Sequence, residues 1–180
     1  MARFTNQAQL RYGRSIANSN IAVGEILEVL SAAKEAVRNT YRQNDTITYV
    51  ISIVNAGTLA YTGLTITDNL GAYPYNTTTL VPLDYMEGTA KYYINGVLQP
   101  APAVTAGPPL VVSGITVPAG GSVTVAYEAA VNEFAPLDTT SVINNTAIVA
   151  GTGITPITAE EEITVESTPV LTITKSVSPV

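Results

Sequence analysis

The feature that most restricts the fold of this chain is the recurrence of apolar residues at every second position of its long runs. In Thr46–Ile53 and Val123–Val131 an apolar side chain recurs at every second position, and Leu64–Thr67 and Ile163–Val165 repeat the pattern over shorter spans. Successive side chains of a strand point to opposite faces of a sheet. The pattern therefore predicts strands that each bury one face.

Glycine-containing turns separate these runs. The segment Lys91–Leu98 predicts a hairpin, since its Asn95-Gly96 pair suits a type I′ turn. The proline-rich residues 100–109 predict an extended surface connection. About nine short strands joined in this way favour an all-β, immunoglobulin-like β-sandwich.

Residues 24–37 have an apolar spacing typical of a helix, but an internal repeat favours a strand. With one gap, Ile21–Lys34 resembles Ile163–Lys175, and the later copy contains the strand-like Leu171–Thr174. Tertiary context routinely overrides helix propensity, so we expect a strand in the earlier copy as well.

A second pair of similar segments divides the chain into three parts. Phe4–Leu10 and Ile143–Val149 both follow the pattern apolar-x-Asn-x-Ala-x-apolar. We therefore expect residues 1–24 to form an N-terminal arm, the closing hairpin of one repeat. Residues 25–167 would form a complete β-sandwich, and residues 168–180 a C-terminal strand that opens a further repeat.

The two terminal segments are candidates for pairing with other chains. An unpaired strand exposes backbone donors and acceptors, and a partner strand can join it by β-augmentation. The alternative is an ordinary edge strand folded onto its own domain. The candidate assembly residues are Phe4, Ala8, Leu10 and Tyr12 in the arm and Val170, Leu171 and Ile173 in the last strand.

Composition excludes several classes of function. Histidine and cysteine are both absent, which removes histidine-based catalysis, zinc and haem ligation through these residues, and disulfides. We expect a protein that is not an enzyme and binds no cofactor. The net charge of −6 argues against nucleic acid as a partner. No apolar run reaches the roughly 18 residues of a membrane span, so we expect no membrane insertion. No signal peptide is recognisable in the sequence.

The charges are unevenly distributed along the chain, and two interpretations remain open. They are either solvated surface charges or a basic head and an acidic tail that attract each other when identical subunits associate end to end. The basic residues of the first part are Arg3, Arg11, Arg14, Lys34, Arg38 and Arg42, and the acidic residues near the end are Glu160, Glu161, Glu162 and Glu166.

Two constellations of side chains are candidate sites. Lys34 or Lys175, with Asn145 and the acid Asp68, has the groups needed for an intramolecular isopeptide bond: an amine, an amide carbon and a proton-shuttling carboxyl group. The alternative is a strand-end lysine and a turn-bonding asparagine. The tyrosines of the middle third form either a sugar-binding surface or the edge of the core. They are Tyr73, Tyr75, Tyr85, Tyr92 and Tyr93.

Five segments carry a resemblance to a known family. They are Thr48–Gly57, Leu64–Leu70, Val117–Gly121, Asn144–Ala147 and Leu171–Ser176. Their order resembles the conserved repeat of bacterial and archaeal surface proteins that is catalogued as domain of unknown function eleven. The resemblance implies immunoglobulin-like sandwiches, often in tandem, that serve as stalk, wall or surface-layer elements without catalytic residues.

The sequence thus predicts a structural subunit that lies outside the cell or on a cell or spore surface. We expect copies of the chain to assemble head to tail into a fibre, tube or layer by strand complementation. One alternative is a stalk module of a longer tandem-repeat adhesin, and another is a carbohydrate-binding module.

Overall fold

The computed structural model describes residues 2–26 and 29–166, and in this part of the chain every regular element is a β-strand. The all-β prediction is therefore confirmed. Residues 24–37, with their helix-like spacing, contribute to two strands, β4 (Ala22–Ile26) and β5 (Leu30–Ala36). No helix of the described residues is long and apolar enough to cross a membrane.

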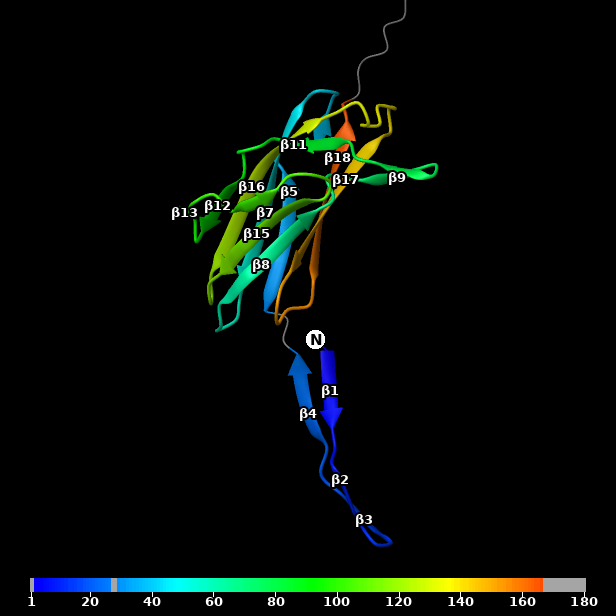
Figure 1. Cartoon of the computed structure of the whole chain (residues 1–180), viewed down its shortest axis with the longest axis vertical. Coiled ribbons are helices and arrows are strands. Elements are labelled where there is room, and N and C mark those ends of the chain that lie inside the picture. Colours follow the sequence, from blue (N-terminus) through cyan, green and yellow to red (C-terminus); the bar gives the residue numbers. More distant parts are fainter. Residues whose placement is uncertain (1, 27–28, 167–180) are drawn as a thin grey trace, which may run out of the picture.

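Two six-stranded sheets pack face to face to form a sandwich (Figure 1). The first sheet has the order β13 (Val97–Leu98), β12 (Lys91–Ile94), β16 (Ser122–Val131), β7 (Thr46–Asn55) and β5, with β11 (Leu83–Tyr85) also beside β16. The second has the order β14 (Ala103–Thr105), β15 (Leu110–Val117), β8 (Tyr61–Asp68), β17 (Val142–Ala150), β18 (Ile157–Val165) and β6 (Thr40–Tyr41). A small hairpin of β9 (Tyr73–Tyr75) and β10 (Thr78–Leu80) lies beside them.

The core lies between the two sheets and follows the alternation of the sequence. In β7 and β16 every second residue is buried, and Tyr49 lies opposite Tyr127 in the register of this antiparallel pair. Each large apolar side chain that is fully buried contributes about 1.5–3 kcal/mol. The alternation therefore places the apolar side chains of each strand between the two sheets, and burial of these side chains supplies most of the driving force for packing the sheets.

Of two connections predicted from the sequence, one is as predicted and the other differs. Asn95 and Gly96 both have positive φ, 48° and 79°, as a type I′ turn requires. The proline-rich segment 100–109, however, is not only a connection, because it contains the edge strand β14, paired with β15. Prolines are tolerated there because they flank the strand and an edge strand has one unpaired side.

The first four strands form an arm separate from the sandwich. In this arm β1 (Ala2–Asn6) pairs with β4, and β2 (Gln9–Tyr12) pairs with β3 (Ser15–Asn18) around a turn at Gly13. Within the described ranges, no strand of the arm joins either sheet of the sandwich. Figure 1 shows the arm as a long hairpin that extends from one end of the body.

Candidate functional site

Three buried polar side chains lie together in the core. Lys34, Asp68 and Asn145 are 4%, 1% and 0% exposed. Lys34 comes from β5 of the first sheet, and the other two come from the neighbouring strands β8 and β17 of the second sheet. The structure thus brings together the amine, the acid and the amide that the sequence singled out. Lys175, the alternative amine, lies outside the described residues.

Strand alternation explains why these residues face the interior. Lys34 is buried while both of its chain neighbours are exposed, and Asn145 lies between the buried residues Ile143 and Ala147 at the same spacing of two. Asp68 ends β8 directly opposite Ala147. The same spacing of two that places apolar side chains in the core therefore also places the charged pair of Lys34 and Asp68 and the amide of Asn145 there.

A continuous chain of hydrogen bonds connects Lys34 to Asn145. The Lys34 Nζ donates to Asp68 Oδ2 at 2.6 Å, and the Tyr127 hydroxyl donates to the same oxygen at 2.6 Å. The Asn145 Nδ2 donates to the Tyr127 hydroxyl oxygen at 3.2 Å. The other carboxylate oxygen, Asp68 Oδ1, accepts from the backbone N–H of Leu70 at 3.0 Å. Lys34, Asp68, Tyr127 and Asn145 are therefore all hydrogen-bonded.

Burial makes the lysine amine easier to deprotonate. Desolvation lowers the pKa of Lys34 to about 8, although the nearby carboxylates of Asp68 and Glu161 act in the opposite direction. The Nζ also lies 4.9 Å from the centre of the Tyr49 ring and 6.0 Å from that of Tyr127. The amine is a nucleophile when neutral, so this environment favours attack on a nearby electrophile.

The carbonyl of Asn145 is held by a backbone donor. The N–H of Gly71 donates to Asn145 Oδ1 at 3.2 Å. Such a donor stabilises negative charge that develops on the oxygen when a nucleophile attacks the carbon. Gly71 has a φ of +73°, and a Cβ there would lie 2.5 Å from Ile143 Cγ2, so the position requires glycine.

Sequence reasoning missed Tyr127, Tyr49 and Gly71 as members of this site. Periodicity predicts that both tyrosines face the core, but it does not indicate which buried polar groups they meet. Tyr49 stacks on Tyr127 with ring centres 5.6 Å apart, and its hydroxyl has no hydrogen-bond partner among the residues described. Gly71 follows the Asp68–Leu70 turn, where a glycine indicates positive φ but no ligand.

The candidate assembly residues of the arm are largely exposed. Leu10 is 71% and Tyr12 85% exposed, and Ala8 is exposed as well. Phe4 pairs in register with Gly24. Val170, Leu171 and Ile173 lie outside the described residues.

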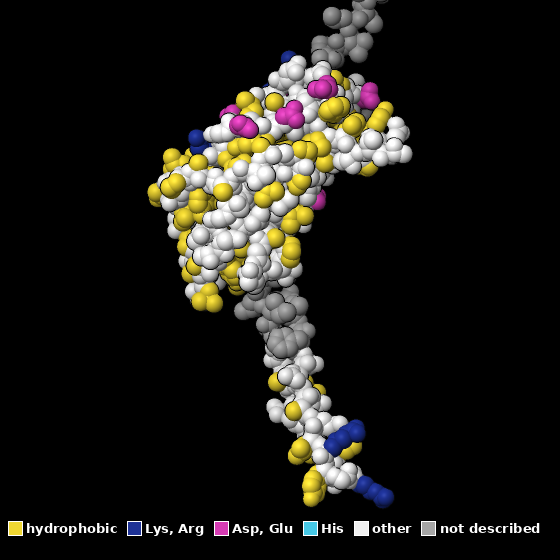
Figure 2. All heavy atoms as spheres, in the orientation of Figure 1, with side chains coloured by type: hydrophobic (Ala, Val, Ile, Leu, Met, Phe, Trp, Pro, Cys, Tyr) yellow, Lys and Arg dark blue, Asp and Glu magenta, His cyan; other side chains and the backbone are white. Residues whose placement is uncertain are grey.

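Half of the early basic residues belong to the sandwich and have acidic partners there. Lys34 pairs with Asp68, while Arg38 and Arg42 both pair with Glu166 at the end of the body. In the view of Figure 2, basic side chains lie on the end of the arm away from the body, and acidic side chains gather over the opposite end of the body.

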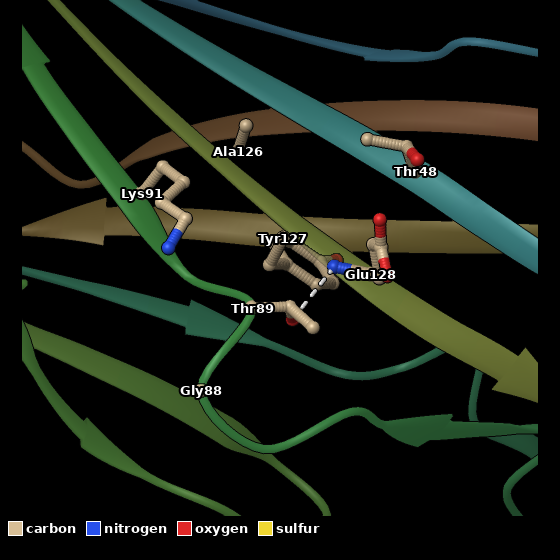
Figure 3. Close-up of a pocket in the computed structure, with 7 residues that line it drawn as sticks. All are labelled: Thr48, Gly88, Thr89, Lys91, Ala126, Tyr127 and Glu128. Carbon is tan, nitrogen blue, oxygen red and sulfur yellow. Dashed lines mark hydrogen bonds between the residues drawn. The ribbon is translucent and has the colours of Figure 1, made fainter.

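The five tyrosines do not form one exposed surface. Tyr92 is buried and its hydroxyl bonds the backbone of Thr116, whereas Tyr75 lies exposed on the small hairpin. A shallow, open hollow of about 320 Å³ lies beside β12 and β16 (Figure 3). Its charged side chains are Lys91 and Glu128. The described residues contain no group of three or more His, Cys, Asp or Glu placed to hold a metal ion.

The fold is similar to that of several solved surface proteins. The pilus backbone RrgB of Streptococcus pneumoniae is 14% identical, over 67% of this chain and 31% of that chain, with a TM-score of 0.53. A variant of the Bacillus cereus major pilin subunit BcpA is 12% identical, over 90% of this chain and 47% of that chain, with a TM-score of 0.52. The N-terminal domain of the Streptococcus gordonii adhesin Sgo0707 is 13% identical, over 83% of this chain and 37% of that chain, with a TM-score of 0.57. The chain spans less than half of each of these proteins. No protein-family model and no curated protein matches the sequence. At these identities the similarity shows a shared β-sandwich fold.

We predict that Gly71→Ala destabilises the protein more than Gly88→Ala. Both glycines have positive φ, but only at Gly71 would the new Cβ meet a packed side chain. Overpacking of this kind costs about 1–3 kcal/mol beyond the backbone strain that the two variants share. Urea denaturation of both variants measures the difference, and equal free energies of unfolding would contradict the close packing described at Gly71.

Proposed function

We propose that this chain is a structural module of a cell-surface fibre or adhesin, and that an isopeptide bond between Lys34 and Asn145 locks its sandwich. The buried Lys34–Asp68–Asn145 cluster is the observation that carries the proposal. The fold shared with pilins and an adhesin domain supports the surface role, as does the resemblance to the conserved-repeat family. A structural role of this kind involves no substrate that is turned over.

The proposed bond forms by simple acyl transfer, with no oxidant or cofactor. Asp68 takes one proton from the Lys34 ammonium, and the neutral Nζ attacks Cγ of Asn145. The bond from Cγ to Nδ2 breaks, and Nδ2 leaves as ammonia after receiving the proton that Asp68 had taken. Asp68 then removes a second proton from Nζ, so that the product is a neutral amide beside a neutral carboxylic acid.

Such a bond would join the two sheets. Lys34 lies on an edge strand of the first sheet, and Asn145 lies on an inner strand of the second. The loop closed between residues 34 and 145 is long, and in the chain-entropy model a crosslink across about 100 residues stabilises the fold by about 4.7 kcal/mol. A module that bears mechanical load benefits from this stabilisation.

We predict that the purified chain is lighter than its sequence by one ammonia, about 17 Da, and that Asn145→Ala restores the full mass because it removes the electrophile. Asn144→Ala is the matched control, since Asn144 is the exposed neighbour on the same strand. Intact-mass spectrometry gives the result, and tandem spectrometry of a digest locates the bond. The full sequence mass in folded, unaltered chain would refute the crosslink. Loss of the bond should also lower the unfolding free energy of Asn145→Ala by several kcal/mol relative to Asn144→Ala.

We also predict that the rate of bond formation falls as the pH rises past about 8. Four groups face the Lys34 amine: Asp68, Glu161, Tyr49 and Tyr127. In the proposed mechanism, the proton that Lys34 and Asp68 share is the one transferred to Nδ2, and the lowered pKa of about 8 marks the loss of that proton from the folded, unlinked cluster. Burial raises the pKa of both tyrosines, so they stay protonated through this range.

The measurement starts from newly synthesised chain held unlinked in denaturant. The chain is refolded by dilution into buffers of different pH, and the loss of ammonia is followed by mass. A rate that keeps rising above about pH 8 would show that the free amine alone limits the reaction, and would contradict the role of the shared proton.

We further propose that the arm joins copies of the chain by strand complementation. Its β1 and β2 contain the counterpart of β17, because Phe4–Leu10 repeats the pattern of Ile143–Val149. In β17, a strand of the second sheet, the residues on the core face are buried. In the arm the corresponding Asn6, Ala8 and Leu10 are exposed. The arm therefore carries a core-facing surface without a core, which a second copy would cover.

We predict that Leu10→Asp abolishes polymers while Leu59→Asp does not. The two leucines are similarly exposed, 71% and 74%, but only Leu10 lies on the proposed docking face. Negative-stain electron microscopy of both variants and of the unaltered chain checks this. Polymers of normal length from Leu10→Asp would remove the arm from the assembly mechanism.

A stalk module of a longer tandem adhesin remains a second candidate, and one observation favours it: the chain spans less than half of each of the similar surface proteins. Monodisperse particles from the unaltered chain would favour this role over self-assembly. Both candidates place the protein outside the cell or on its surface.

A further inference from the structure

The hydroxyl of Tyr127 lies between the acid and the leaving group of the proposed reaction. It donates to Asp68 Oδ2 at 2.6 Å and accepts from Asn145 Nδ2 at 3.2 Å. Tyr127 belongs to β16 of the first sheet, whereas both of its partners belong to the second sheet. The side chain is buried, and it connects the two reacting halves of the site from across the core.

The crosslinking reaction has a specific requirement that the Lys34–Asp68 pair does not meet by itself. An amide nitrogen is a poor leaving group unless it is protonated, so the proton that Asp68 takes from lysine must reach Nδ2. In the described hydrogen-bond network, Asp68 Oδ2 and Asn145 Nδ2 are linked through the Tyr127 oxygen. This phenol is therefore a candidate path for the proton.

We propose that Tyr127 is a catalytic residue of the isopeptide reaction and relays the proton from Asp68 to the leaving nitrogen. This inference rests on the proposed crosslink. When Nζ adds to Cγ, the planar amide nitrogen becomes a tetrahedral amine and gains a lone pair. Both hydrogen bonds then reverse: Asp68 gives its proton to the Tyr127 oxygen, and Tyr127 gives its own proton to Nδ2. The tyrosine ends with one proton, as it began, and ammonia departs.

The environment of the Tyr127 hydroxyl favours a proton relay over ionisation of the phenol. Desolvation raises the pKa of Tyr127, and the negative charge of Asp68 raises it further, so a lone tyrosinate is strongly disfavoured there. Transfer of one proton in while another leaves avoids that anion. The ring is held by stacking on Tyr49, which limits the movement of its hydroxyl between the two partners.

Tyr92 supplies the matched control. Tyr92 and Tyr127 are both buried, and they lie on the neighbouring strands β12 and β16 of the first sheet. Each hydroxyl makes two hydrogen bonds, but those of Tyr92 go to the backbone of Thr116, whereas those of Tyr127 go to Asp68 and Asn145. Removing one oxygen atom from either ring therefore changes packing to a similar degree, but breaks the relay only at Tyr127.

The test compares Tyr127→Phe with Tyr92→Phe in the refolding assay, following the loss of ammonia by intact mass. We expect Tyr127→Phe to slow the reaction by roughly 100-fold or more, the usual contribution of a positioned proton-transfer group, while Tyr92→Phe stays close to the unaltered chain. Near-ultraviolet circular dichroism identifies any variant that does not fold. Equal rates for the two folded variants would overturn the relay, even though the crosslink itself still forms.

A second measurement needs no variant. Two protons move together in the relay, so the rate of the unaltered chain in mixtures of H₂O and D₂O should fall along a curve with the deuterium fraction. A straight line, the sign of a single proton in flight, would overturn the relay. Absence of ammonia loss in the unaltered chain would instead refute the crosslink proposed above, so the two failures are distinguishable.

Discussion

The buried ion pair of Lys34 and Asp68 is the constraint to which the rest of the core is adapted. Moving two charges out of water costs several kcal/mol per ion, and their attraction repays this only when the remaining lone pairs are also satisfied. Tyr127 and the N–H of Leu70 meet that condition on the side of the carboxylate. An apolar pair would fill the same space at a lower cost, so retention of the charges is more readily explained by chemistry than by stability.

The proposed amide resolves this tension. In the proposed reaction lysine and aspartate would enter the folded state as a charged pair and would end as a neutral amide and a neutral acid, which an apolar core accommodates with less desolvation. The rigid sandwich fixes the amine on one sheet and the amide on the other before reaction. The folding free energy of the sheets thus serves to hold the reactants together, as preorganisation does in enzymes.

The sequence predicts the scaffold well because the scaffold depends on periodicity. Runs such as Val123–Val131 indicate strands, and the internal repeat corrects the helix-like spacing of residues 24–37. Lys34, Asp68 and Asn145 could be chosen as candidate site residues from their chemistry, but whether they lie close together depends on the long-range register of the strands. Tyr127 could not be chosen, because a buried tyrosine in an alternating run has the same pattern whether it fills space or bridges two reactants. The strand β14 was missed because prolines mask its short alternation.

The position of the crosslink also determines how the chain is connected. If the amide forms, residues 34–145 become a closed ring, and the polypeptide before Lys34 and after Asn145 leaves that ring from two adjacent points in the core. Most of the surface turns, including the Asn95-Gly96 hairpin and the β9–β10 hairpin, lie within the ring. A single proteolytic cut in any of them would open the ring without dividing the molecule, so the continuity of a fibre built from such modules would survive damage at these turns.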